Sequence, residues 1–368
     1  MQQRGVFTAT VTLVGMTVGA GILGIPYVVQ KAGFLTGIFS LVLVAFLLLM
    51  NHLYLGEVVL RTKGYHQLPG LAEKYLGFHG KLLMSLAFIL EGYGALAAYF
   101  IGFGKVFTVI FGGNPLFYSI LLFLVFSALL YFGLKVMSQS ENVLVTLLLL
   151  SVLALFLLGF SSFSFERLTE FSLGKILLPY GVLLFAFLGS PAIPELAKEV
   201  KYKKDLRKAI VYGVLLVAVI YVLFTFIMVG LFGSRVEELA TMSLGNLSFF
   251  ALVLGNLFAF LTMGTSFLAL GFTLKDMFIL DFSLKHLLAW FLALVPAFFL
   301  GISGLSFIQI LQITGVFAGG LTLFLILVMH SKAKTQGERK PEYSIPDSFF
   351  LKAVFTLIIL LGVVLMIF

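Results

Sequence analysis

Long apolar stretches separated by short polar segments dominate this chain. A window of about 19 residues, which suits a helix that crosses a bilayer, predicts eleven membrane spans. In chain order the predicted spans are Phe7–Val29, Phe34–Val58, Leu82–Phe111, Leu116–Phe132, Val143–Phe160, Ile176–Leu196, Ala209–Phe232, Leu247–Leu274, Leu287–Leu300, Leu305–Met329 and Phe349–Phe368. We therefore expect an all-α polytopic membrane protein.

The composition supports this expectation. Of the 368 residues, 61% are apolar and 11% are charged. About a quarter of the residues of a soluble domain are charged, so the outer surface of this chain is expected to face lipid. The chain has no cysteine, which excludes disulfides and thiolate metal sites. Its net charge of +8 comes without a basic stripe interleaved with aromatic residues, so we predict no nucleic-acid partner.

The basic residues predict the orientation. If the N-terminus is cytoplasmic, nineteen Lys and Arg residues fall in cytoplasmic segments and four fall outside, namely Lys31, Arg167, Lys175 and Arg235. Cytoplasmic loops of membrane proteins are enriched in these residues. We therefore expect a multi-pass protein of the cell (inner) membrane with a cytoplasmic N-terminus. An odd number of spans places the C-terminus outside.

Two predicted spans contain residues that interrupt helices. The first span carries Gly15, Gly19, Gly21, Gly24 and Pro26, and the sixth carries Gly189, Pro191 and Pro194. Glycine weakens a helix, and proline removes a backbone donor and clashes with the preceding turn. Unwound backbone is tolerated in a bilayer where it lines a polar cavity. We predict that both helices unwind at mid-membrane; a close packing face between helices is the alternative for the first span.

The two interruptions fall at matching positions of two five-span units. Because five is odd, the second unit would enter the membrane from the opposite face. We expect a first inverted repeat in residues 1–160, a second in residues 161–330, and a cytoplasmic linker with an eleventh helix in residues 331–368. Interrupted segments at matching positions of two repeats indicate the binding site of a transporter.

Three segments resemble one transporter family. Thr17–Tyr27, followed by Ala32-Gly33-Phe34, is similar to the first helix of the amino acid/auxin permease family of the amino acid–polyamine–organocation superfamily. Phe187–Glu195 resembles the sixth helix of that family, and Thr265–Asp276 resembles the eighth helix of its aromatic and hydroxy amino acid permease branch. The resemblance extends over nearly the whole chain in span number and order. It implies the LeuT-type fold, with substrate at mid-membrane between helices one and six.

The resemblance implies a substrate site built largely from backbone groups. N–H groups at the start of a half-helix would hold the substrate carboxylate, where the helix carries a partial positive charge. Carbonyls at the end of another half-helix would receive the ammonium group. The N–H groups are those around Ala20, Gly21 and Ile22, and the carbonyls are those of Phe185, Ala186 and Phe187. Gly19 and Gly189 complete the predicted substrate site. Tyr27 and Tyr99, with these phenylalanines, are candidates to surround an apolar or aromatic side chain.

The resemblance also implies a coupling ion. Many proteins of this fold hold sodium between helices one and eight, where oxygen donors suit a hard cation. The matching donors here are the carbonyls of Gly15, Val18 and Thr262 and the hydroxyls of Thr265 and Ser266. Alternatively, these hydroxyls bond to their own backbone and the coupling ion is a proton, as is usual in the aromatic branch. Both H+ and Na+ stay open, and we predict no other cofactor.

Ionisable residues inside predicted spans are functional candidates. Glu91 lies about ten residues into the third span, near mid-depth, and is either a proton carrier or a hydrogen-bonded structural acid. His52 and Glu57 lie toward the cytoplasmic end of the second span, which favours an interface role. Glu195 begins the cytoplasmic half of the sixth helix, and it is a gate candidate together with Tyr99.

These features predict a secondary active transporter of neutral amino acids, with aromatic ones as the narrower option. It would work by alternating access in symport with H+ or Na+. A channel or facilitator for small zwitterions and an integral-membrane enzyme are the alternatives. The five histidines are scattered without metal-ligand spacing, which disfavours an enzyme. The expected partners are the amino acid substrate and membrane lipid. The sequence does not predict the oligomeric state, and it is compatible with a monomer.

Overall fold

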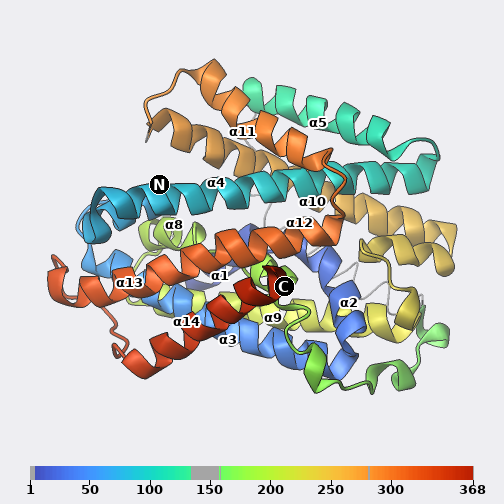
Figure 1. The fold of residues 1–368 in the computed structure, drawn as a ribbon, viewed down its shortest axis with the longest axis horizontal. Coiled ribbons are helices and arrows are strands. Elements are labelled where there is room, and N and C mark those ends of the chain that lie inside the picture. Colours follow the sequence, from blue (N-terminus) through green and yellow to red (C-terminus); the bar gives the residue numbers. More distant parts are fainter. Residues whose placement is uncertain (1–4, 134–156, 158, 281, 368) are drawn as a thin grey trace.

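The computed structural model describes residues 5–133, 157, 159–280 and 282–367, and every regular element within them is helical (Figure 1). The α-helices are α1 (Val6–Thr17), α2 (Gly21–Ala32), α3 (Phe34–Arg61), α4 (Leu68–Phe111), α5 (Pro115–Tyr131), α7 (Tyr180–Ala186), α8 (Ala192–Glu199), α9 (Asp205–Phe232), α10 (Phe249–Leu280), α11 (His286–Gly301), α12 (Phe307–Thr314), α13 (Gly320–Gln336) and α14 (Phe349–Ile367). A π-helical turn, Gly315–Gly319, joins α12 and α13 into one continuous helix.

Helices occupy ten of the eleven predicted spans, and the fifth, Val143–Phe160, lies mostly outside the described residues. Within the described part of the chain, six helices are long and apolar enough to cross a bilayer, or seven when the bent pair α1–α2 counts as one span. The helices α5 and α11 are shorter, with 17 and 16 residues. The helix α4 begins earlier than predicted, because a short leading helix precedes the predicted span. The two are separated by a kink at Gly77, whose φ of 74° is not helical.

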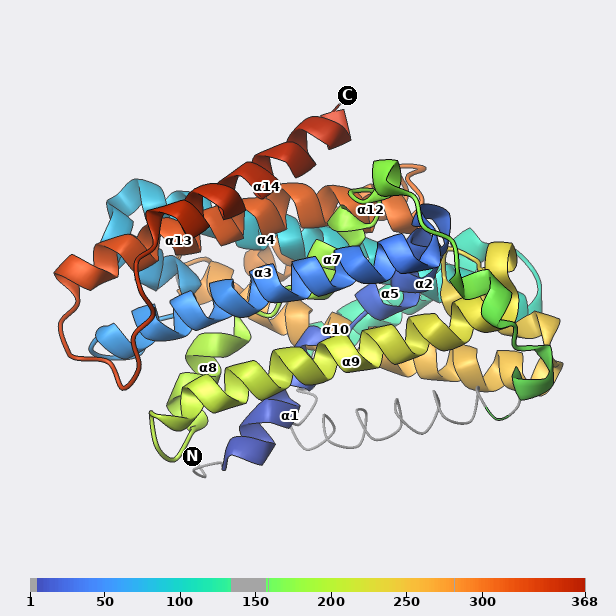
Figure 2. The same cartoon turned by 90° about the horizontal axis from the view of Figure 1, so that it is seen from below.

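The outer surface of the bundle is apolar. The long helices run alongside one another (Figures 1 and 2), and their outward faces carry bulky apolar side chains. Phe39, Val42 and Phe46 on α3 and Leu357 and Leu361 on α14 are each between 43% and 57% exposed. Such a surface is unfavourable in water but suits hydrocarbon. The chain is therefore a multi-pass membrane protein.

A cluster of phenylalanine rings holds α4, α5, α10 and α11 together. Phe103 of α4 stacks on Phe126 of α5 with ring centroids 5.0 Å apart, and Phe267 of α10 lies 5.6 Å from Phe126. Phe298 of α11 joins the cluster through Phe100 of α4, also at 5.6 Å. Because aromatic pairs add about 0.5–1.5 kcal/mol each beyond the burial of their area, these four helices form a firm wall beside the site described below.

The segment 337–348, between α13 and α14, is anchored to the bundle. The sequence predicts a linker that starts at Ser331, but α13 continues to Gln336. Beyond it, the hydroxyl of Tyr343 donates to the Leu53 carbonyl of α3 at 2.8 Å. Tyr343 is buried, which raises the pKa of its phenol well above the ordinary value. The linker thus packs against α3 instead of lying free.

Glu57 of α3 connects this segment to the bundle. Its fully buried carboxylate accepts hydrogen bonds from Arg61 at 2.8 Å, Lys334 at 2.7 Å and the Ile345 backbone N–H at 2.7 Å. Nε2 of His330 lies 3.1 Å from the second carboxylate oxygen. These donors replace the water that a buried carboxylate otherwise needs. Glu57 therefore forms a buried junction of α3, α13 and the linker.

Candidate functional site

The predicted interruption of the first span is present. The helix α1 ends at Thr17 and α2 begins at Gly21, with a bend of 67° between their axes. Val18 has already left the helical conformation, with a ψ of 99°. The first N–H groups of α2 lack carbonyl partners within their own helix. They therefore bring a partial positive charge to the break.

The predicted interruption of the sixth span is also present. The helix α7 ends at Ala186 and α8 begins at Ala192, with residues 187–191 between them. Pro191 stands just before α8 and Pro194 lies in its first turn, where a missing backbone donor costs little. At the end of α7, the Phe185 carbonyl accepts the Leu188 N–H at 3.2 Å, whereas the Ala186 carbonyl receives no described backbone N–H. One break thus presents donors and the other presents acceptors.

The two breaks touch each other. A Cβ added to Gly21 would lie 2.6 Å from Cα of Ala186, so only glycine permits this approach. Tyr221 of α9 is fully buried, and its hydroxyl donates to the Ala186 carbonyl at 2.7 Å and lies 3.4 Å from the Thr17 carbonyl. Sequence reasoning missed Tyr221. Its hydroxyl within an apolar span was the only feature of the sequence that could have indicated a role. Its hydrogen bonds link the ends of α1 and α7.

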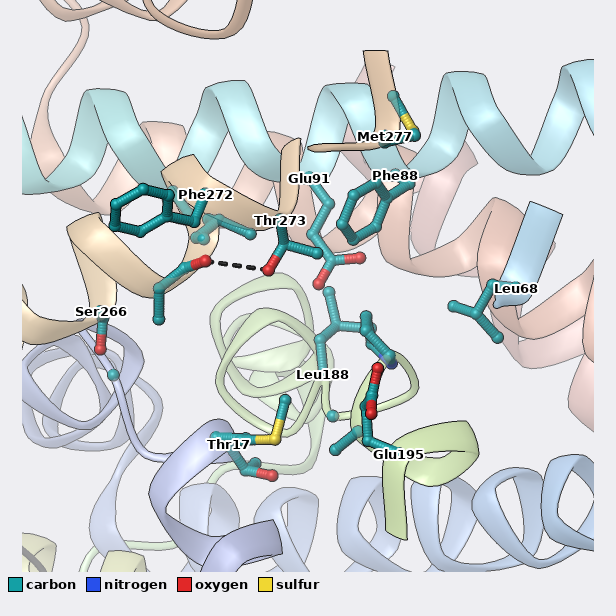
Figure 3. Close-up of a pocket in the computed structure, with 18 of the residues that line it drawn as sticks. Thr17, Leu68, Phe88, Glu91, Leu188, Glu195, Ser266, Phe272, Thr273 and Met277 are labelled. Carbon is teal, nitrogen blue, oxygen red and sulfur yellow. Dashed lines mark hydrogen bonds between the residues drawn. The ribbon is translucent and has the colours of Figure 1, made fainter. Parts of the chain in front are cut away.

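A cavity of about 460 Å³ begins between the breaks and runs along α4 and α10 (Figure 3). On α10 the lining extends from Thr265 to Leu280, a stretch of about 22 Å of helix. Tyr99 of α4 stands at the inner end of the cavity, and Gln67 and Leu280, both exposed, stand at the other. The cavity therefore leads from the breaks toward the end of the bundle where α3 turns into α4.

The cavity is acidic. Glu91 from α4, Glu195 from α8 and Asp276 from α10 line it, and its described lining contains no Lys, Arg or His. Figure 3 shows Glu91 and Glu195 projecting toward the same space. The hydroxyl of Tyr65, in the connection before α4, donates to Glu195. Burial, together with this carboxylate, raises the pKa of Tyr65 above its ordinary value. Such a lining favours cations and ammonium groups over anions.

The structure brings most of the predicted substrate residues together. Those that line the cavity are Gly19, Ala20, Gly21, Phe185, Ala186 and Gly189. Ile22, Tyr27 and Phe187 lie outside the lining. Phe187 packs instead on Tyr221, with ring centroids 5.0 Å apart, and the Lys31 ammonium lies 5.5 Å from the ring centroid of Tyr27.

The gate candidate Tyr99 lies at the first break. Its hydroxyl lies close to the side chain of Ser266 and the backbone of Ala20. A Cβ added to Gly19 would lie 3.2 Å from that hydroxyl and 3.5 Å from Oγ of Ser266. Tyr99 therefore stands at the start of α2, where the substrate carboxylate is expected, and Glu195 stands nearer the exposed end.

The predicted ion-binding residues are only partly gathered. Of the sodium candidates, Gly15, Thr265 and Ser266 line the cavity, whereas Val18 and Thr262 are buried outside its lining. The hydroxyl of Thr265 donates to the carbonyls of Leu261 and Thr262 in its own helix, at 3.0 and 3.1 Å. Within the described residues, no group of three or more histidines and carboxylates gathers to hold a metal ion.

Sequence reasoning missed one face of α10. Thr273 and Asp276 follow Ser266 along α10 and also line the cavity, and Met277 adds an apolar side chain. The signal was available, because polar residues seven and ten positions after residue 266 fall on nearly the same side of an apolar helix. His52, expected at an interface, is 1% exposed and lies beside the second break, its Cε1 3.5 Å from a Cβ added to Gly189.

This arrangement of helices is shared with a solved structure. The crystal structure of MhsT in complex with L-phenylalanine matches the chain with a TM-score of 0.70 and 17% identity, over 100% of both chains. This likeness confirms the LeuT-type fold expected from the sequence. Two interrupted helices that meet at the head of a cavity in a membrane-embedded bundle define a solute transporter of that fold.

The chain belongs to the tryptophan/tyrosine permease family, whose sequence profile matches residues 2–368. It is similar to glutamine transporter 2 of Aliivibrio fischeri, with 24% identity over 346 residues that cover 88% of each protein. It is also similar to the tyrosine-specific transport system 1 of Haemophilus influenzae, with 27% identity over 290 residues, which cover 73% of this chain and 71% of the relative. The family and both relatives are transporters and not enzymes.

Proposed function

We propose that this protein is a secondary active transporter that carries neutral amino acids, aromatic ones included, across the cell (inner) membrane by alternating access. The observation that carries the proposal is the contact between the two breaks at the head of the cavity. The start of α2 offers N–H groups to a carboxylate, and the end of α7 offers carbonyls to an ammonium group. An α-amino acid carries both charges on one carbon, so it suits two such sites side by side.

The comparisons support an amino acid as the substrate. The family is named for tryptophan and tyrosine, and the two relatives are named for glutamine and tyrosine. The cavity of about 460 Å³ falls within the range of small-molecule sites, and Phe88, Phe185 and Phe272 contribute aromatic walls. This membership also agrees with a place in the amino acid/auxin permease family and its superfamily.

The charge distribution supports an inward-facing conformation. The cavity leads to the end of the bundle that carries Lys63, Lys198 and Lys204, and cytoplasmic ends of membrane proteins are rich in such residues. We infer that this end is cytoplasmic, as is the N-terminus, and that the C-terminus lies outside. Residues 1–160 and 161–330 are then the two inverted repeats, each with its interruption in its first span.

The acidic cavity supports coupling to a cation. Glu91, a carboxylate inside the membrane, lines the cavity as a candidate proton carrier, and the oxygen donors near Ser266 suit sodium. The bonds of Thr265 to its own helix favour the proton. A facilitator for small zwitterions is the second candidate, because the same cavity would also suit transport that is not coupled to an ion gradient.

Uptake into proteoliposomes tests this function. We expect labelled tyrosine, tryptophan, phenylalanine or glutamine to accumulate above its external concentration under an inward proton or sodium gradient, and each gradient is imposed separately. Unlabelled amino acids compete to rank the substrates. A facilitator would only equilibrate the label. No uptake of any amino acid under either gradient would contradict the proposal.

Gly19→Val should remove substrate binding while the protein stays folded. The new side chain would fill the space next to the hydroxyls of Tyr99 and Ser266, which are the ends of side chains and can shift. We expect the affinity to fall at least about tenfold, or about 1.4 kcal/mol. Thermal unfolding with and without the amino acid gives the ligand-induced rise. The same substitution at Gly21 is unsuitable, because it would meet the backbone of Ala186 and disturb the fold.

A further inference from the structure

A second cavity lies at the start of α9, away from the substrate site. Its volume is about 400 Å³, and it is bordered by three cations, Lys204, Arg207 and Lys208. The linker closes the other side with Glu342 and Tyr343. The walls are therefore built by two segments that are far apart in sequence, and the cavity does not depend on the proposed function.

The cavity has an excess of positive charge. The one carboxylate in the described lining, Glu342, is already paired with Arg339 at 2.5 Å. Among the described residues, none of the three bordering cations forms an ion pair with a carboxylate. A loop that is basic only because it is cytoplasmic would leave its cations dispersed in water. Here Lys204, Arg207 and Lys208 border one cavity, so the cavity is suited to bind an anion.

The basic cavity continues into an apolar stripe along α9. Lys204 and Lys208 are followed on the same helix face by Tyr212, Leu215, Val219 and Leu223, at spacings of three or four residues. The last four side chains are 54%, 51%, 52% and 45% exposed. From residue 208 to residue 223 the helix rises about 22 Å, more than the depth of one leaflet, which is about 15 Å. Figure 2 shows α9 in the foreground, at the surface of the bundle.

We propose that this face of α9 binds an anionic phospholipid, with its phosphate between Lys204, Arg207 and Lys208 and an acyl chain along Leu215, Val219 and Leu223. Charge at one end and exposed apolar side chains at the other match the two parts of such a lipid. Tyr212 stands between them, at the level where aromatic residues favour the membrane interface. A soluble phosphate would use the basic end alone, so the stripe distinguishes the lipid.

Occupancy of the site would connect α9 to the linker. Tyr343 borders the cavity and is hydrogen-bonded to Leu53 of α3, so a bound headgroup lies across three segments. A ligand that binds only the folded protein raises its stability by mass action. We therefore expect phosphatidylglycerol to raise the unfolding temperature of the purified protein, and phosphatidylcholine, which has no net charge, to have little effect.

The test compares two triple variants of the full chain. In the first, Lys204→Gln, Arg207→Gln and Lys208→Gln remove the basic end of the site. In the matched control, Lys63→Gln, Lys285→Gln and Lys332→Gln remove three exposed cations that do not border this cavity. Each cation near an anionic headgroup contributes about fivefold in affinity, or about 1 kcal/mol. We expect the first variant to bind phosphatidylglycerol about a hundredfold more weakly than wild type, and the control to change less than about fivefold.

Native mass spectrometry of detergent-purified protein with titrated phosphatidylglycerol measures this binding, and unfolding in phosphatidylcholine confirms that each variant is folded. Leu215→Asn with Val219→Asn should also weaken phosphatidylglycerol binding, while the basic cavity is intact. Equal loss in both triple variants would show that only net charge matters and would overturn the proposal. So would inorganic phosphate that protects the protein as well as the lipid does.

Discussion

Glu91→Gln should abolish proton-driven accumulation of the amino acid while exchange across the membrane continues. Glu91 lines the cavity and is 8% exposed, and no described basic side chain pairs with it. An isolated buried carboxylate is costly when charged. We therefore expect its charge to be neutralised either by a bound proton or by the transported cation. Glutamine keeps the shape but cannot take up or release a proton. We expect accumulation under a proton gradient to fall at least about tenfold, which corresponds to about 1.4 kcal/mol.

Counterflow separates the proton role from a structural role. Proteoliposomes loaded with unlabelled substrate exchange it for labelled substrate without net ion movement, so Glu91→Gln should retain this activity. The matched control is Glu73→Gln, which removes a 49%-exposed carboxylate that pairs with Lys81 at 3.0 Å, outside the cavity. Loss of accumulation and counterflow together would assign Glu91 a structural role. Full accumulation in Glu91→Gln under a sodium gradient would point to sodium as the coupling ion.

The two breaks could be predicted because the rules for glycine and proline are local. Four glycines and a proline in an apolar span weaken a helix whatever surrounds it. The sequence did not tell which of these residues unwind. Gly24 and Pro26 lie inside α2, and a Cβ at Gly24 would lie 2.9 Å from Ile308 and 3.0 Å from Leu311 of α12. Packing between helices, the alternative considered for this span, explains Gly24, whereas Gly19 belongs to the break.

The parts of the site that escaped prediction depend on which faces of distant helices meet. Tyr221 bonds to Ala186 and Thr17, which are 35 and 204 positions away. Glu57 meets the linker across 288 positions, through the backbone of Ile345. Periodicity shows that a residue lies in a helix, but it does not show which neighbour receives its hydrogen bond. A single polar residue in an apolar span therefore predicts a hydrogen bond, but it does not identify the partner.

Glu57→Ala should cause the largest loss of stability. The substitution leaves Arg61, Lys334 and the Ile345 N–H without their shared acceptor, and His330 is fully buried beside them. Breaking a buried ion pair by removing one partner costs about 3–5 kcal/mol, because the remaining charge is buried and uncompensated. We expect a clear fall in the thermal unfolding temperature in detergent. Glu57→Gln keeps an acceptor oxygen without the charge. Its unfolding temperature should lie between those of Glu57→Ala and wild type.

Glu73→Ala is the control for this comparison, because it also removes a carboxylate from an ion pair with a lysine. Its side chain is 49% exposed, and pairs at such positions contribute about 0–1 kcal/mol. Since both substitutions remove one negative charge, a difference between them measures burial and hydrogen bonding and excludes net charge. Equal unfolding temperatures for the two variants would mean that water replaces Glu57 at the junction. The linker between α13 and α14 would then be held by Tyr343 and its other contacts, with α3 and α13 packed independently of the carboxylate.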